Sequence, residues 1–87
     1  MAGLNVSVVS ADREVWSGDT TMVVARTTEG QIGILAGHEP MLAILAQGQV
    51  RITRADGSTV AVDAEDGFLS VEHDTVTIVA RQAALAS

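Results

Sequence analysis

Two histidines and a group of carboxylates are the residues of this chain whose types could do chemistry. His38 and His73 are the only imidazoles, and neither has a second histidine or a cysteine at the spacing that a zinc site uses. The carboxylates Asp63, Glu65 and Asp66 lie close together, but they lack the alternating oxygen donors and the closing glutamate of a calcium loop. We therefore expect no bound metal, and we expect these carboxylates to lie in a solvated turn.

The other residue types that could catalyse a reaction lack the arrangement that catalysis needs. Asp12 and Glu14 could form an acid–base pair, but the pattern places them beside a short turn on an open edge, where no apolar pocket would raise a pKa. The serines lack the glycine-flanked elbow of a hydrolase. The glycines of residues 30–37 are only faintly similar to a phosphate loop, because no helix and no lysine follow them. We predict no catalytic residue and no cofactor.

The stretch from Gly30 to Pro40 is the most informative part of the chain, because it holds three of the eight glycines and the single proline. Glycine adopts backbone conformations that a β-carbon forbids, and the residue before a proline avoids helical dihedrals. Ile32 and Ile34 favour a strand. A strand should therefore end here at a sharp corner, with polar side chains at the surface: Glu29, Gln31, His38 and Glu39.

Length and composition fit one small β-rich domain. A chain of 87 residues has room for a single core. Because 47% of the residues are hydrophobic and only Trp16 and Phe68 are aromatic, that core must consist of Val, Ile, Leu and Ala. We expect both aromatic residues in the core, given the area that each can bury. A net charge of −6 without any lysine opposes binding to nucleic acid or to anionic lipid.

Short apolar runs separated by turn residues predict an all-β fold, a small antiparallel sandwich or flattened barrel. The clearest hairpins turn at Asp56-Gly57 and at residues 72–74, and Asp19-Thr20 is expected to break the chain between two strands. Residues 41–46 could form a helical turn or a strand. Residues 81–87 favour a helix but are too few for a stable one. The other expected strands are 5–10, 13–18, 21–27, 31–35, 50–53, 59–62, 67–71 and 75–80.

The corner resembles the corresponding turn in the epsilon chain of F-type ATP synthases, where a Glu-Gly pair is followed by Gly-Ile, a proline and then Gly-His-x-Pro-Leu. Two positions depart from that pattern: Ala36 stands where the family usually has proline, and Gln31 where it often has an acidic residue. The resemblance favours a strand for residues 41–46. It covers nearly the whole chain, including Asn5-Val6, Trp16-Ser17-Gly18, Gly48-Gln49-Val50-Arg51-Ile52, Asp66-Gly67-Phe68-Leu69-Ser70-Val71 and Val76-Thr77-Ile78-Val79-Ala80.

This resemblance implies a β-sandwich domain over residues 1–82 and a short tail at 83–87, where the family's two-helix domain would begin. It implies a non-catalytic central-stalk subunit that binds the gamma chain and rests on the membrane rotor ring of c subunits, peripheral at the cytoplasmic face of the cell membrane, without inserting into lipid. A hydrogen bond within the turn is the alternative role for His38, and a free-standing binding module is the alternative for the chain. The ring contact carries over to Glu29, Gln31, Gly37, His38 and Glu39.

Overall fold

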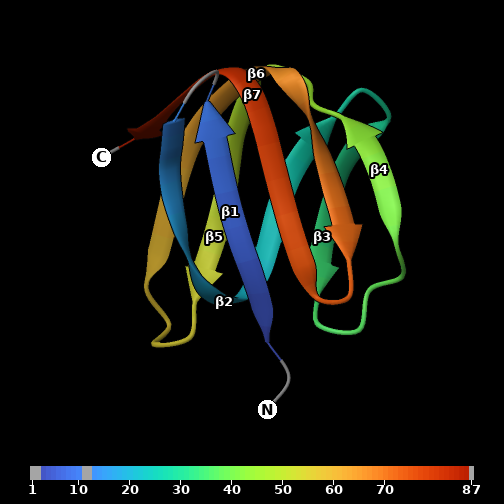
Figure 1. Ribbon diagram of the computed structural model, residues 1–87, viewed down its shortest axis with the longest axis vertical. Helices are drawn as coiled ribbons and strands as arrows, with labels where there is room; N and C mark the ends of the chain where they lie inside the picture. The colour runs from blue at the N-terminus through green and yellow to red at the C-terminus, as the bar shows by residue number, and fades with distance from the viewer. Residues whose placement is uncertain (1–2, 11–12, 87) are drawn as a thin grey trace.

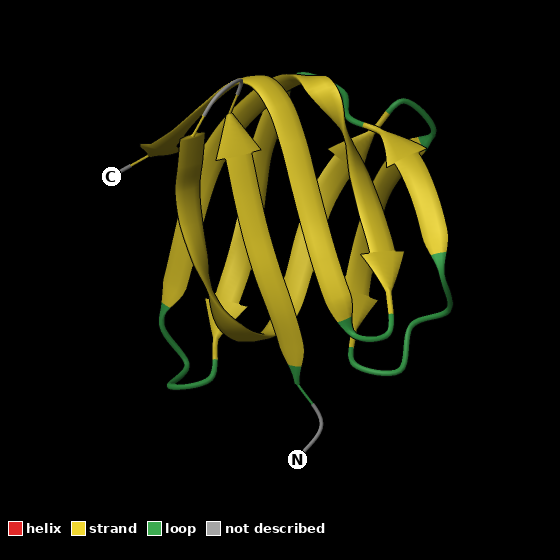
Figure 2. Ribbon diagram, in the orientation of Figure 1, coloured by secondary structure: helices red, strands yellow, loops and turns green. Residues whose placement is uncertain are grey.

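A computed structural model of the chain describes residues 3–10 and 13–86, which form seven β-strands and no helix (Figures 1 and 2). The expected all-β fold is confirmed. Within this described part, no helical segment has the length and hydropathy needed to cross a bilayer. The strands are β1 Leu4–Ser10, β2 Arg13–Thr27, β3 Gly30–Leu35, β4 Met41–Ile44, β5 Gly48–Arg54, β6 Thr59–Glu72 and β7 Thr75–Ala86.

The strands pair into a flattened barrel of two layers. Their order is β1-β7-β6-β5-β2-β3, with β4 beside β6, and β1 also pairs with β2. Pairing of β1 with β2 returns the sheet to its first strand, which removes most of the open edges that a sheet would otherwise expose. β1 and β7 run parallel, whereas the other strand pairs of the described chain are antiparallel. The expected antiparallel arrangement therefore has one exception.

Three strands, β2, β6 and β7, are much longer than the sequence pattern predicted, because each passes from one layer to the other. β2 joins the expected strands 13–18 and 21–27. Its first half pairs with β1 and its second half with β5 and β3. Thr20 is 2% exposed at the bend, where the register with β5 shifts before Met22. The predicted break at Asp19-Thr20 is wrong, because β2 continues through these residues. Polar residues occur where a strand bends as well as in turns, so the sequence pattern did not distinguish the two.

β6 and β7 cross between the layers in the same way. β6 joins the expected strands 59–62 and 67–71, and its two halves pair with β5 and with β4. β7 runs beside both halves of β6 and continues to Ala86. Residues 83–86, expected as a tail, are therefore strand, and the boundary expected at residue 82 falls inside β7. Pairing with residues 61–64 of β6 gives this segment a ladder of hydrogen bonds that outweighs its helical preference.

The core between the layers is aliphatic, as its composition required. Trp16 is half-buried against it, but Phe68 is 39% exposed, so the prediction that Phe68 is a core residue is wrong. Side chains alternate between the faces of a strand, and after Gly67 it is Leu69 that points inward. The buried apolar residues are Leu4, Val6, Val8, Val23, Ala25, Ile34, Leu45, Val50, Ile52, Val62, Ala64, Leu69, Val71, Val76, Ile78 and Ala80.

The turn expected at Asp56-Gly57 is confirmed between β5 and β6. Gly57 has a φ of 91°, in the region that favours glycine, and its amide donates to the Arg54 carbonyl at 2.9 Å. The Asp56 carboxylate accepts hydrogen bonds from the Ser58 amide at 2.9 Å and from the Ser58 hydroxyl at 2.6 Å. The carboxylate therefore closes the turn in its ionised form.

Acid should weaken this turn. The Ser58 hydroxyl, followed by the Ser58 amide, holds the pKa of Asp56 below its ordinary value of 3.8. A carboxyl whose pKa falls on folding stabilises the fold above the unfolded pKa, and that stability is lost as the pH drops through the folded pKa. Asp56→Asn should therefore make the melting temperature decline less steeply below about pH 4. Thermal unfolding followed by circular dichroism checks this, with exposed Asp19→Asn as control; equal effects of both would contradict it.

Candidate interaction surfaces

The corner expected after β3 is present at residues 36–40, between the edge strands β3 and β4. Gly37 has a φ of 85°, and the His38 amide donates to the Leu35 carbonyl at 3.1 Å. The Gly37 amide donates to the Oδ1 atom of Asp74, in the turn between β6 and β7, at 2.7 Å. Figure 1 shows this turn and the corner at the same end of the molecule, at the bottom of the view.

His38 makes a local contact through one of its two ring nitrogens. Its Nδ1 atom lies 2.7 Å from the Glu39 carbonyl oxygen. A carbonyl oxygen only accepts hydrogen bonds, so Nδ1 carries the hydrogen, and the neutral ring keeps Nε2 as an acceptor. The imidazole is partly exposed. The hydrogen bond within the turn therefore exists, and it sets the tautomer in which His38 can meet a partner's donor.

The five residues expected to form one contact lie in two groups. Glu29 is in the turn before β3 and Gln31 is near the start of this strand, whereas Gly37, His38 and Glu39 follow its end. A strand of six residues is about 17–20 Å long, which separates the groups. The first group is fixed by Thr27, whose hydroxyl donates to the Gly30 carbonyl at 2.7 Å and accepts from the Glu29 amide at 3.2 Å.

An apolar stripe crosses the outer face of the layer that contains β4. Ile44 of β4 pairs with Phe68 of β6, which pairs with Val79 of β7, which in turn pairs with Val9 of β1. Opposite residues in a sheet point to the same face, so these side chains form a row. Ile44 is 56% exposed, and Leu42, two residues earlier on the same face of β4, is 68% exposed. The apolar stripe comprises Leu42, Ile44, Phe68, Val79 and Val9.

The apolar stripe has a signal in the sequence, although none of the expected contacts includes it. Residues 41–45 are all apolar, and continuous apolar runs are typical of strands that are covered on both faces. In this fold the inward side of β4 faces the core through Leu45 and the partly buried Met41, while the chain leaves the outer side bare. A strand that is apolar on both faces but covered on one indicates contact with another molecule.

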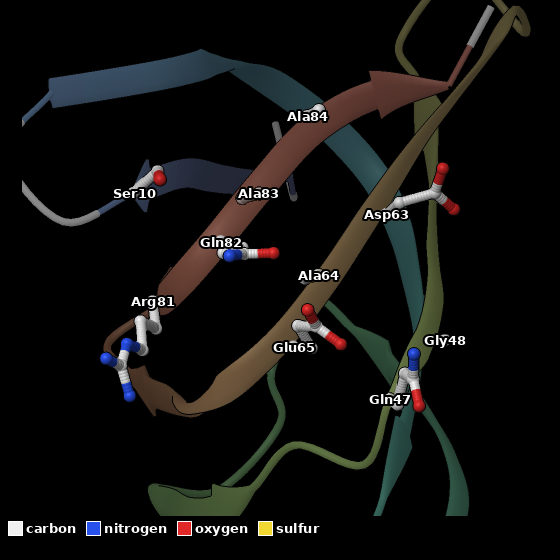
Figure 3. Close-up of a pocket in the computed structure, with 10 residues that line it drawn as sticks. All are labelled: Ser10, Gln47, Gly48, Asp63, Ala64, Glu65, Arg81, Gln82, Ala83 and Ala84. Carbon is white, nitrogen blue, oxygen red and sulfur yellow. The ribbon is translucent and has the colours of Figure 1, made fainter.

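The carboxylates expected in a turn instead lie along β6, so that prediction is wrong. Asp63 and Glu65 line a shallow surface hollow with Gln47 and Gln82, and the Arg81 side chain points away from Glu65 (Figure 3). Asp66 has a φ of 58° where the strand bends. Residues 3–10 and 13–86 contain no group of three or more side chains that could hold a metal ion. The pair formed by Asp12 and Glu14 cannot be placed, because Asp12 lies outside the described residues.

Together, the two-layer fold and the apolar stripe define a small β-sandwich domain with an outer face suited to contact with another protein. Residues 3–86 match the family model described as ATP synthase, Delta/Epsilon chain, beta-sandwich domain. The chain belongs to this family. It is 53% identical to the ATP synthase epsilon chain of Micrococcus luteus over 85 residues, which are 98% of this chain and 93% of that relative. It is 48% identical to the epsilon chain of Streptomyces coelicolor over 84 residues, 97% of this chain and 68% of that one.

Solved structures show the same fold. A chain of the Euglena gracilis mitochondrial ATP synthase, solved with its c-ring, matches with a TM-score of 0.91 at 25% identity, over 98% of this chain and 54% of that chain. A chain of the Tetrahymena thermophila mitochondrial ATP synthase central stalk and c-ring matches with a TM-score of 0.74 at 16% identity, over 92% of this chain and 64% of that chain. The present chain thus spans about half of the Euglena chain.

Proposed function

We propose that this chain is a non-catalytic subunit of the central stalk of an ATP synthase, peripheral at the cytoplasmic face of the cell membrane. It joins the gamma chain to the membrane ring of c subunits and so helps to couple proton flow to ATP synthesis. Membership of the family supports the assignment of this chain to an ATP synthase. The apolar stripe is the observation that supports its role in the central stalk. A stalk part must pass torque without deforming, and a close-packed aliphatic core resists compression.

The apolar stripe is the proposed docking surface for the gamma chain. It presents an aromatic side chain flanked by two large aliphatic ones, the composition found at the centres of stable interfaces. Burial of apolar surface is worth roughly 25 cal/mol per Å² before the costs of association. A partner that stays bound while the rotor turns needs such a surface, whereas the polar edge of β3 suits a weaker contact.

The ring contact is proposed to run along the exposed edge of β3. Glu29 and Gln31 lie at one end of this edge and Gly37, His38 and Glu39 at the other, so an extended contact is needed to include all five. Their polar groups suit hydrogen bonds to polar loops, each of which contributes modestly. The ring contact would therefore be weak alone and would depend on the larger gamma interface to hold the chain in place.

Substitution of His38 tests the ring contact. His38→Ala removes the Nε2 acceptor from a partly exposed site, so the melting temperature should stay close to that of the wild type. Loss of one hydrogen bond should weaken binding of the chain, in complex with the gamma chain, to detergent-solubilised c-ring by about 2-fold to 12-fold. Gln31→Ala tests the other end of the edge, and Thr59→Ala, an exposed residue of β6, is the control.

Two outcomes would contradict this assignment. A large drop in the melting temperature of the His38→Ala variant would make His38 a structural residue of the corner. Unchanged ring binding by both the His38 and the Gln31 variants would remove the β3 edge from the contact. A folded chain that binds neither gamma chain nor ring would favour the alternative, a free-standing binding module.

A further inference from the structure

A single side chain joins the corner to a distant turn. Residues His73 and Asp74 have φ values of 50° and 58° and connect the paired residues Glu72 and Thr75. Such a two-residue loop with positive φ at both positions is a type I′ hairpin, in which aspartate is among the preferred residues. From this turn the Oδ1 atom of Asp74 reaches the Gly37 amide at 2.7 Å, across 37 residues of sequence.

The corner has few other restraints. Gly37 is exposed and lies in a conformation that glycine can readily leave. The preceding residue is Ala36, which lacks the ring with which proline would fix its own φ. The strands on either side, β3 and β4, are each paired along one side only. The His38 amide bonds only within the corner, to the Leu35 carbonyl at 3.1 Å, whereas the hydrogen bond from the Gly37 amide to Asp74 ties the part of the corner that carries His38 to another turn.

Aspartate suits this role for three physical reasons. Its carboxylate accepts a charge-assisted hydrogen bond, which is shorter and stronger than a neutral one. Its side chain is short, so little conformational freedom is lost when the bond forms. It also tolerates the left-handed backbone of the turn. The turn itself is anchored separately, since the Asp74 carbonyl accepts a hydrogen bond from the Asn5 amide at 2.9 Å.

We propose that Asp74 is a positioning residue that clamps the β3–β4 corner and so holds His38 in the orientation that meets the rotor ring. This inference rests on the proposed ring contact. Asp74 acts through Gly37 and need not touch the ring. Loss of the clamp would let the corner move, and the ring would then have to order it on binding at a cost in affinity.

The clamp is tested first in the isolated full chain, without any partner. Asp74→Gly suits the positive φ and removes the carboxylate, whereas Asp74→Asn keeps an oxygen acceptor. His73→Gly alters the same turn and leaves Asp74 in place. Amide hydrogen exchange of Gly37, measured by NMR, should become about tenfold faster or more in Asp74→Gly. It should rise less in Asp74→Asn, whose neutral oxygen accepts a weaker hydrogen bond, and stay near the wild-type rate in His73→Gly. An unchanged rate in Asp74→Gly would overturn the clamp.

Binding of the same variants, each in complex with the gamma chain, to detergent-solubilised c-ring tests the docking role. Asp74→Gly should bind about threefold to tenfold more weakly than His73→Gly, and Asp74→Asn should restore most of the affinity. If Asp74→Gly shows fast exchange at Gly37 yet binds as the wild type does, the ring contact stands and the docking role of Asp74 is overturned. If the wild-type chain fails to bind the ring even when the gamma chain holds it, the proposed ring contact is wrong and the docking role falls with it.

Discussion

Gly67→Ala should destabilise the protein by about 3 kcal/mol or more. A β-carbon at this position would lie 1.8 Å from the Val79 carbonyl oxygen and 2.5 Å from the Ala80 Cα atom. Both are backbone atoms of the paired strand β7, so no side chain can turn aside to relieve the overlap. Because β6 bends between the layers here, separating the two strands would also disturb their pairing on both sides.

Urea unfolding followed by circular dichroism measures this loss, and Gly33→Ala is the matched control. A β-carbon on Gly33 would meet no atom within 4 Å, and this glycine is also in a strand. Its replacement should leave stability nearly unchanged or slightly higher, because alanine restricts the unfolded chain. A Gly67→Ala variant within about 1 kcal/mol of the wild type would show that the strands can part at the bend without cost.

Ile44→Asp should reduce binding to the gamma chain at least 100-fold. The side chain lies at the centre of the exposed end of the apolar stripe, beside Phe68 and Leu42. An aspartate there would place an unpaired charge in an apolar interface, at a cost of several kcal/mol. Because Ile44 is 56% exposed in the isolated chain, the fold itself should change little. Calorimetric titration gives the affinity, and the melting temperature gives the stability.

Thr59→Asp serves as the control for the added charge, since Thr59 is exposed on the half of β6 that pairs with β5. It should bind the gamma chain nearly as the wild type does. Equal losses in both variants would indicate a general effect of negative charge on a chain that already carries a net charge of −6. An Ile44→Asp variant with affinity within threefold of the wild type would show that the gamma chain binds elsewhere.

Local sequence signals predicted the local structure well. The alternation of Val50 and Ile52 with polar residues predicted a strand, which is present as β5. The turn predicted from Asp56-Gly57 is present at those two residues. These features depend on neighbours in sequence, which a pattern contains. The strand favoured by the resemblance for residues 41–46 is present as β4, Met41–Ile44.

The structure differs from the expected one where contacts between distant parts of the chain decide the local conformation. The polar residues near Thr20 and Asp63 look like turns, but pairing with other strands carries β2 and β6 through them. Phe68 faces outward because the bend at Gly67 sets which residues of β6 point to the core. Residues close in sequence to the corner, such as Gln31, are carried away from it by the length of β3.

Binding to the gamma chain is the central claim, and isothermal titration of this chain with purified gamma chain from the same source tests it most directly. We expect saturable one-to-one binding with a negative change in heat capacity, because the apolar stripe would be removed from water. Absence of both heat and co-elution, with the chain shown to be folded, would contradict the claim. The chain would then be a free-standing binding module that keeps the fold of its family.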